Sequence, residues 1–135
     1  MFAVEFDTDS LSLLIAPQDE PAALDRLLEG DSAFVWGLLI NPRLIRELTG
    51  HWLPFAPARI EGYRRSVLRD GDRLDLRLEP ESGSCVDGVL LLGLSREDRA
   101  ALDRFERAGE VMRREPIECL LGERRVATSI YLRIQ

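Results

Sequence analysis

Glu106 is the residue of this 135-residue chain whose position best suits acid–base chemistry. It follows Leu102 by four positions and Phe105 by one, so on a helix its carboxylate would lie at the edge of an apolar stripe. Partial desolvation there raises the pKa of a carboxylate and suits it to act as a general base near neutral pH. Asp103 would add a like charge if it points the same way. The same pattern is typical of a solvated residue at a helix end, so both interpretations stay open.

Gly37 is the second candidate, because it lies in an apolar run that leads into a helix signal. The run at residues 33–40 lacks polar alternation, which is typical of a strand buried on both faces. A strand that ends in glycine before a capped helix leaves backbone N–H groups that can hold a carboxylate or an oxyanion. The alternative is a strand bulge that packs against its neighbour.

Other kinds of catalysis find little support in the residue types. His51 is the only histidine, so multi-histidine metal sites are excluded; we expect it to have a surface or packing role, with a catalytic dyad as the alternative. All 18 basic residues are Arg, which excludes a lysine nucleophile, a Schiff base and a P-loop lysine. Motifs for dinucleotides, nucleotide phosphates, redox thiols and zinc are missing. Cys85 and Cys119 do not make a disulfide framework, and we expect two buried thiols in strands.

The helices that would position these residues are marked by their ends. Helices are expected between Asp19 and Gly30, between Asn41 and Gly50, and between Ser95 and Gly109. Asn41 is a good N-cap before Pro42, and Ser95 with Asp98 resembles a capping box.

The remaining elements are strands. Residues 1–16 predict a hairpin, and residues 79–83 a turn between two later strands. Further strands are expected at 58–67, 73–78, 86–92, 117–121 and 126–134. Many strands with three short helices and little β-α-β alternation predict an α+β domain built on a curled sheet or small barrel.

The composition indicates a folded domain with an acidic balance. Hydrophobic residues make up 45%, and 18 basic against 24 acidic residues give a formal net charge of −6. This balance argues against a general binder of nucleic acid or anionic membranes. The Arg pairs at 64–65, 113–114 and 124–125 would either gather into an anion-binding patch or lie as solvated charges at strand ends. With neither a signal peptide nor a membrane-length apolar run in the sequence, we expect a cytoplasmic protein.

Five short motifs follow one another along the chain. They read FVWGLL at 34–39, NPRL at 41–44, ARIEGYR at 58–64, VDGVL at 86–90 and LDRFE at 102–106. In this order they resemble the gamma-glutamylcyclotransferase superfamily, and its AIG2-like branch in particular, over about residues 33–133. The resemblance implies a small mixed β-barrel with flanking helices at residues 33–135. Residues 1–32 would be an added N-terminal segment, a hairpin plus a helix, packed on this core.

The resemblance also implies a reaction. Members of the family cleave γ-glutamyl amides by attack of the substrate's own α-amine on its γ-carbonyl, which releases 5-oxoproline and an amine without a metal or cofactor. Their general acid/base corresponds to Glu106. Their loop, which binds the γ-glutamyl group through main-chain N–H groups, corresponds to Trp36, Gly37, Leu38 and Leu39. Tyr131 matches a tyrosine that the family often has in its last strand.

Three positions depart from the family pattern, and each loses a hydroxyl. Trp36 replaces a Tyr, Leu38 replaces a Ser or Thr, and Met112 stands where a Tyr usually precedes the Arg pair. Two hypotheses follow: an enzyme acting on a small γ-glutamyl substrate, or a catalytically degenerate domain that binds a small ligand or a protein. The apolar residues within 1–32 would cover the core or form a homodimer contact. No nucleic-acid or membrane partner is expected.

Overall fold

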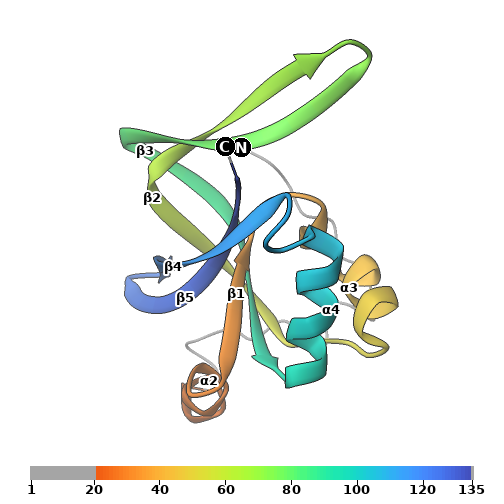
Figure 1. Cartoon of the computed structure of the whole chain (residues 1–135). Helices are drawn as coiled ribbons and strands as arrows, with labels where there is room; N and C mark the ends of the chain where they lie inside the picture. Colours follow the sequence, from red (N-terminus) through yellow and green to blue (C-terminus); the bar gives the residue numbers. More distant parts are fainter. Residues whose placement is uncertain (1–20, 135) are drawn as a thin grey trace.

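The structure, a computed structural model, describes residues 21–134; the hairpin expected at residues 1–16 lies outside them. Figure 1 shows one sheet with helices packed around it. Of the expected N-terminal segment, the structure describes the last part, where a helix leads into the first strand and Leu24 of that helix is buried in the core. The elements are, in chain order, α2 (Pro21–Leu28), β1 (Asp31–Val35), the 3-10 turn η1 (Leu38–Ile40), α3 (Pro42–Thr49), β2 (Phe55–Asp70), β3 (Arg73–Leu94), α4 (Arg96–Glu106), β4 (Met112–Leu121) and β5 (Arg124–Arg133).

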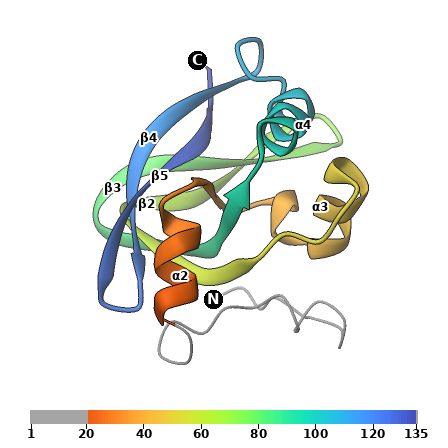
Figure 2. The same cartoon turned by 90° about the horizontal axis from the view of Figure 1, so that it is seen from below.

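The sheet has the order β1-β3-β2-β4-β5, and its four pairings are antiparallel. The strands curl rather than lie flat (Figure 2), so the two edge strands approach each other. Ser32 of β1 shares a hydroxyl hydrogen bond of 2.7 Å with Thr128 of β5, and Ser129 Oγ donates to the Ser32 carbonyl at 3.0 Å. We call this contact the seam. The α+β class is confirmed. The sheet is curled but is not a closed barrel, because side-chain contacts join β1 and β5 where a barrel would have backbone hydrogen bonds.

The strands β2 and β3 form one long hairpin with a bulge in the middle. Pairing runs to Glu61 opposite Cys85, then resumes at Tyr63 opposite Pro80, so β3 carries extra residues at this point. Gly62 and Gly83 there have φ of 86° and 88°, a conformation that favours glycine. The prediction of a turn at 79–83 is therefore wrong: Glu79 and Pro80 pair with β2, and residues 81–84 form a bulge within one continuous strand.

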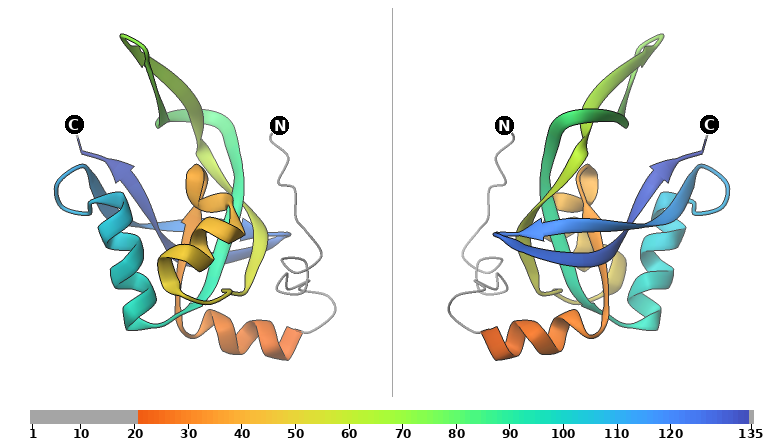
Figure 3. Two further views of the ribbon diagram at one scale, coloured as in Figure 1. Left: turned by 90° about the vertical axis from the view of Figure 1, so that its right-hand side faces the viewer. Right: turned by 90° about the vertical axis from the view of Figure 1, so that its left-hand side faces the viewer.

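Beyond the bulge the hairpin projects from the rest of the fold, at the end opposite to α2 (Figures 1 and 3). The projecting half carries exposed apolar side chains, which are Val67, Leu68, Leu74 and Leu76.

The core has two clusters, one on each face of β1. Phe34 packs with Leu24 of α2, whereas Ala33 and Val35 pack with residues of α3 and α4, including Ile45 and Leu102. This confirms a strand buried on both faces for residues 33–35, but the strand expected over 33–40 ends at Val35, because residues 38–40 form the 3-10 turn η1 and Leu38 is exposed. Both cysteines are unpaired. Cys119 is buried as expected, but Cys85 beside the bulge of β3 is exposed, so the prediction of a second buried thiol is wrong.

The predicted N-caps of α3 and α4 are confirmed, whereas the helix start expected at Asp19 lies outside the described residues. Asn41 Oδ1 accepts a hydrogen bond from the Arg43 amide at 2.9 Å, ahead of α3. Ser95 and Asp98 form both bonds of a capping box at the start of α4. This helix ends before the expected Gly109, because Arg107 takes a left-handed conformation with φ of 53°. Glu106 is consequently the last residue of α4.

Gly88 is required by close packing. A Cβ atom there would overlap the Val35 carbonyl oxygen and lie 2.6 Å from Cζ of the Phe34 ring. We expect Gly88→Ala to lower the free energy of unfolding by about 1–3 kcal/mol, the usual cost of overpacking, as measured by urea denaturation. Gly30→Ala is the matched control, since its Cβ would meet only the Leu27 carbonyl at 3.6 Å. Equal midpoints for the two variants would contradict the packing argument.

Candidate active site

A cavity of about 280 Å³ opens between the end of β1, the end of α4 and the projecting half of the β2–β3 hairpin. It brings together all six residues that the family resemblance assigned to the site, although they come from four separate elements or loops. These are Trp36, Gly37, Leu38, Leu39, Glu106 and Tyr131. Leu74, Asp75 and Leu76 of β3 and Met112 of β4 also line it, and sequence reasoning did not place the hairpin residues here.

Glu106 is partly buried in the wall of this cavity, beside Phe105. Burial raises its pKa above the ordinary value for a glutamate. Asp103 does not act on it as a neighbouring like charge, because Asp103 instead pairs with Arg114 at 3.2 Å. A carboxylate in this state can accept and return a proton closer to neutral pH than an exposed one.

The loop after β1 lines the cavity with Trp36, Gly37, Leu38 and Leu39. The two hydrogen bonds of η1 are donated by the amides of Ile40 and Asn41, at 3.1 and 3.2 Å. The amides of Gly37, Leu38 and Leu39 come before these two and donate no hydrogen bond within the turn. A Cβ on Gly37 would meet nothing within 4 Å, so Gly37 is not a tightly packed bulge. Leu38 is 73% exposed at the rim, whereas Leu39 is buried beneath the loop.

Arg65 of β2 is hydrogen-bonded to the backbone of this loop. One of its terminal nitrogens donates to the Trp36 carbonyl at 3.1 Å and to the Asp87 carbonyl at 2.6 Å. Burial lowers the pKa of Arg65, and the nearby Asp87 opposes that effect. Sequence reasoning counted Arg65 only as one member of an arginine pair. Its position next to the Gly62-Tyr63 motif was the signal that could have found it.

The three arginine pairs do not gather into one patch. Arg64 contacts Glu79, Arg113 contacts Glu115, and Arg124 contacts Asp25. The second members contact other groups: Arg65 the two carbonyls described above, Arg114 Asp103, and Arg125 Glu118. The interpretation as solvated charges at strand ends is confirmed for the pairs at 113–114 and 124–125, whereas the pair at 64–65 lies within β2.

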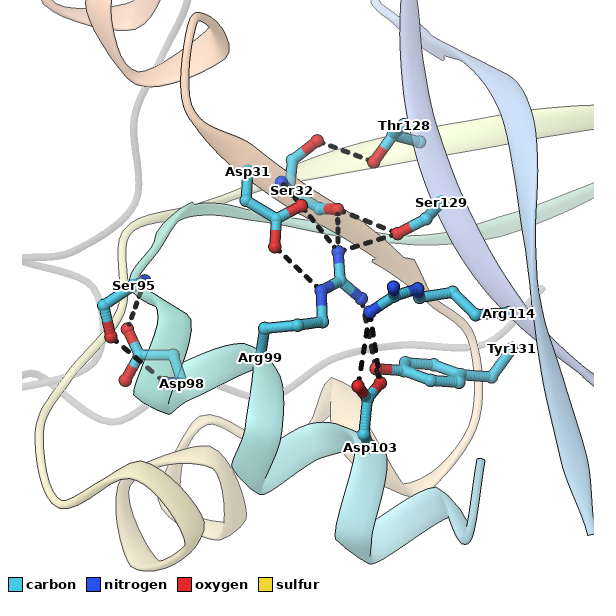
Figure 4. Close-up of polar contacts among 10 residues, drawn as sticks. All are labelled: Asp31, Ser32, Ser95, Asp98, Arg99, Asp103, Arg114, Thr128, Ser129 and Tyr131. Atoms are coloured by element: carbon cyan, nitrogen blue, oxygen red, sulfur yellow. Dashed lines mark hydrogen bonds and ion pairs between the residues drawn. The ribbon is translucent and has the colours of Figure 1, made fainter. Parts of the chain in front are cut away.

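A polar network centred on Arg99 of α4 lies behind the cavity (Figure 4). Arg99 is 9% exposed and donates to both carboxylate oxygens of Asp31 at 2.8 Å. It also donates to the Ser32 carbonyl at 2.7 Å and to Ser129 Oγ at 2.8 Å. Burial alone would lower the pKa of Arg99, but the hydrogen bonds to Asp31 and Tyr131 raise it overall. The network thus fastens α4 to both sides of the seam.

Tyr131 joins the network to the cavity wall. Its side chain is buried, with 3% exposed. The Tyr131 hydroxyl donates a hydrogen bond to Oδ1 of Asp103 at 2.5 Å and accepts one from Arg99 at 3.1 Å. Burial, followed by the bond to Asp103, raises its pKa to about 12. The hydroxyl proton of Tyr131 is therefore held by Asp103 and is not offered to a ligand.

His51, in the loop after α3, contacts the first turn of α4 and is not among the residues that line the cavity. Its Nε2 atom is 2.6 Å from Oδ1 of the buried Asp98. Burial alone would raise the pKa of Asp98, but hydrogen bonds from the Ser95 backbone and His51 lower it. His51 therefore fits the surface or packing role that we expected: its side chain is half exposed and contacts the carboxylate that caps the helix.

Within the described part of the chain, no group of three His, Cys, Asp or Glu side chains is arranged to hold a metal ion. The same residues contain no helix with the length and apolar character that a membrane crossing requires.

Comparison with known proteins gives one family and a consistent set of folds. The family model described as gamma-glutamyl cyclotransferase, AIG2-like, matches residues 33–135. No curated protein sequence matches the chain.

Three solved structures resemble the fold. Two are Arabidopsis thaliana proteins, one at 21% identity and TM-score 0.65 over 76% of this chain and 61% of that one, the other at 22% and 0.67 over 78% and 69%. The third is named gamma-glutamyl cyclotransferase, at 14% identity and TM-score 0.66 over 78% of this chain and 67% of that one. At these identities the likeness shows the fold, and this chain spans 61% of the first protein's length.

Proposed function

The chain belongs to the gamma-glutamyl cyclotransferase, AIG2-like family, and on that basis we propose that it releases 5-oxoproline and an amine from a small γ-glutamyl amide or amine. One observation carries the proposal: Glu106, with a pKa raised by burial, lines the same cavity as the loop at Gly37, whose first amides donate no hydrogen bond within η1. A cavity of about 280 Å³ is at the small end for ligand pockets, which suits a group as small as γ-glutamyl.

In the proposed reaction the nucleophile belongs to the substrate. Glu106 accepts a proton from the α-ammonium group, and the freed amine attacks the γ-carbonyl carbon. The tetrahedral intermediate then loses the bond to the leaving nitrogen, to which Glu106 returns the proton. The ammonium loses two hydrogens in all and the leaving nitrogen gains two, so the amine departs as an ammonium ion. Holding the amine against the carbonyl supplies the proximity that ring closure needs.

The amides of Gly37, Leu38 and Leu39 would supply the donors that this reaction requires. Oxygen atoms of a γ-glutamyl group carry negative charge in its carboxylate and develop it at the γ-carbonyl, and fixed backbone N–H groups stabilise both. Arg65 supports this role from a distance, because it ties the Trp36 carbonyl to the adjoining strand.

The direct test is 5-oxoproline release from a panel of γ-glutamyl amides, γ-glutamyl amines and γ-glutamyl dipeptides. Release from at least one compound supports the enzyme. The binding alternative draws on one observation, that the residues which lack the family hydroxyls, Trp36, Leu38 and Met112, make the cavity wall more apolar. If no compound of the panel releases 5-oxoproline, and calorimetry shows that one of them binds, the binding alternative is favoured.

The pH dependence of the reaction should report on Glu106. The base must be ionised, and burial raises its pKa, so kcat/KM should fall on the acid side with a midpoint above the ~4.3 of an ordinary glutamate. The measurement is kcat/KM against pH with the best panel substrate. A rate that stays constant down to about pH 4.5 would contradict the role of a buried base.

The cytoplasmic location and the homodimer contact expected from residues 1–32 stay predictions. Mass in solution, with and without residues 1–30, tests the second of them.

A further inference from the structure

Exposed apolar side chains gather at the mouth of the candidate active-site cavity. Leu38, Leu74 and Leu76 all line the cavity, although Leu74 is 64% exposed and Leu76 is 46% exposed. Among the side chains described between residues 21 and 134, six large apolar ones are exposed, so half of them border this one opening. Such side chains are unremarkable when they are scattered, but a group of them around one cavity is typical of a binding surface. We call these three leucines the apolar rim.

The apolar rim has two sides, which come from distant parts of the chain. Leu38 belongs to η1, whereas Leu74 and Leu76 belong to β3 in the projecting half of the hairpin (Figure 3). Because Leu74 and Leu76 are two positions apart in a strand, they point to the same face of the hairpin. Val67 lies opposite Leu76 in β2 and extends this face. An apolar face of the hairpin is therefore continuous with the cavity that holds Glu106.

The hairpin is fixed beside the cavity by a charged contact. Asp75, between the two leucines of β3, forms an ion pair with Arg133 of β5. Leu68 lies opposite Asp75 in β2, so it belongs to the other face of the hairpin. The ion pair ties the hairpin to the strand that also carries Tyr131, and it balances the charge of Asp75.

The polar groups of the cavity do not suit a charged leaving group. No arginine is among the described residues that line the cavity. Asp75 is balanced by Arg133, and the hydroxyl proton of Tyr131 is held by Asp103. A carboxylate on the leaving group would therefore meet no cation in this wall. A hydrocarbon group would instead cover the exposed leucines and release the water around them.

We propose that the apolar rim binds a hydrocarbon group on the leaving amine, so that the preferred substrates are γ-glutamyl amides of amines with a branched or aromatic apolar group. This inference rests on the proposed function, because it places the γ-glutamyl group between Glu106 and the loop at Gly37. The cavity is small, so the part of the substrate beyond the γ-amide nitrogen reaches the mouth. There it lies between Leu38 on one side and Leu74 and Leu76 on the other.

The test compares two substrates that differ only in apolar surface. γ-Glutamyl-methylamide and γ-glutamyl-isopentylamide are uncharged beyond the γ-glutamyl group, and their leaving amines have similar basicity. Each buried CH₂ group contributes roughly a factor of four to binding. Isopentyl has four more carbons than methyl, and part of it stays in water at the mouth, so we expect kcat/KM to be about tenfold higher for the isopentylamide. The measurement is 5-oxoproline release.

A matched pair of variants on the hairpin locates the effect. Leu74→Ser removes part of the apolar rim and should lower the ratio of isopentylamide to methylamide to about threefold or less. Leu68→Ser removes an equally apolar side chain, 44% exposed, from the other face and away from the residues that line the cavity. It should keep the native ratio. Leu76→Ser should also lower the ratio, and it serves if Leu74→Ser fails to fold.

The outcomes separate this inference from the proposed function. Turnover of both amides at equal kcat/KM would overturn the apolar site and leave the proposed function standing. A ratio that Leu74→Ser and Leu68→Ser leave equally intact would also overturn it. If neither amide is turned over, the proposed function fails for these substrates and calorimetry with both amides decides the site. Tighter binding of the isopentylamide, weakened in Leu74→Ser alone, would support the site, and equal affinities would overturn it.

A second copy of the chain is the other occupant that the apolar rim could have. Mass in solution is therefore measured for the native protein and both serine variants. A native dimer that Leu74→Ser, but not Leu68→Ser, converts to a monomer would assign the rim to contact between copies and overturn the proposal. A mass that the two substitutions leave equal to the native value supports the substrate site.

Discussion

Replacing Glu106 with glutamine should reduce kcat for 5-oxoproline release by about 10²–10⁴-fold, the range for loss of a general acid–base group. Glutamine keeps the shape of the side chain at the end of α4 but cannot take a proton from the α-ammonium. The substitution should not destabilise the fold. Burial raises the pKa of Glu106, which means that its charged form is disfavoured in the folded protein, and a neutral side chain avoids that cost.

Activity and unfolding should be measured on the same preparation. Glu110→Gln is the matched control, because Glu110 follows α4 closely, is exposed and pairs only with Arg107 among the ion pairs of the described residues. This control should retain native kcat. If Glu106→Gln also retained activity within a few-fold of native, Glu106 would not be the base.

Replacing Arg99 with methionine should lower the free energy of unfolding by about 3 kcal/mol. Breaking a buried ion pair costs about 3–5 kcal/mol, and the lower end applies because the side chain of Asp31 is 45% exposed. The loss includes the hydrogen bonds from Arg99 to Ser32 and Ser129 across the seam, which methionine cannot replace. Urea denaturation measures the change.

The control for Arg99 is Arg124→Met, which removes an exposed ion pair and should cost less than about 1 kcal/mol. Acid supplies a second readout. The hydrogen bond from Arg99 holds the pKa of Asp31 below its ordinary value, although burial opposes it, so this stabilisation is present above the unfolded-state pKa of about 3.9 and is lost as pH falls through the lower folded value. The difference between native protein and Arg99→Met should therefore shrink at low pH. Equal losses for the two variants at neutral pH would refute the role given to Arg99.

Local signals predicted the elements well where neighbouring residues determine them. The caps at Asn41 and Ser95 depend on residues two or three positions away, and both formed as expected. Glycine and proline were less reliable as signals of a turn between strands. The group at 79–83 contains the residues of a turn, yet a facing strand was available beyond it, and pairing across the bulge kept β3 continuous.

Distant contacts explain what sequence reasoning missed. Nothing around Arg99 indicates that it would be buried, because its partners Asp31 and Tyr131 are 68 and 32 positions away. The hairpin residues at 74–76, which lie beyond the bulge, line the cavity beside residues of β1 and α4 that are distant in sequence. The short motifs at Gly37 and Glu106 were readable in the sequence, whereas their meeting in one cavity depends on the whole sheet.

The seam has a consequence for the order in which the molecule assembles and opens. The contacts of Ser32 with Thr128 and Ser129 close loops of 96 and 97 positions, whereas β2–β3 and β4–β5 are local hairpins. Long-range closure is the slower step in folding, and a junction without backbone ladder bonds is where local opening begins. Trp36 follows β1, on one side of the seam, and Tyr131 belongs to β5, on the other side. Opening the seam therefore separates the walls of the cavity while the β2–β3 and β4–β5 hairpins stay paired. Amide exchange at the ends of β1 and β5 would therefore track loss of the ligand site at denaturant concentrations too low to unfold the protein.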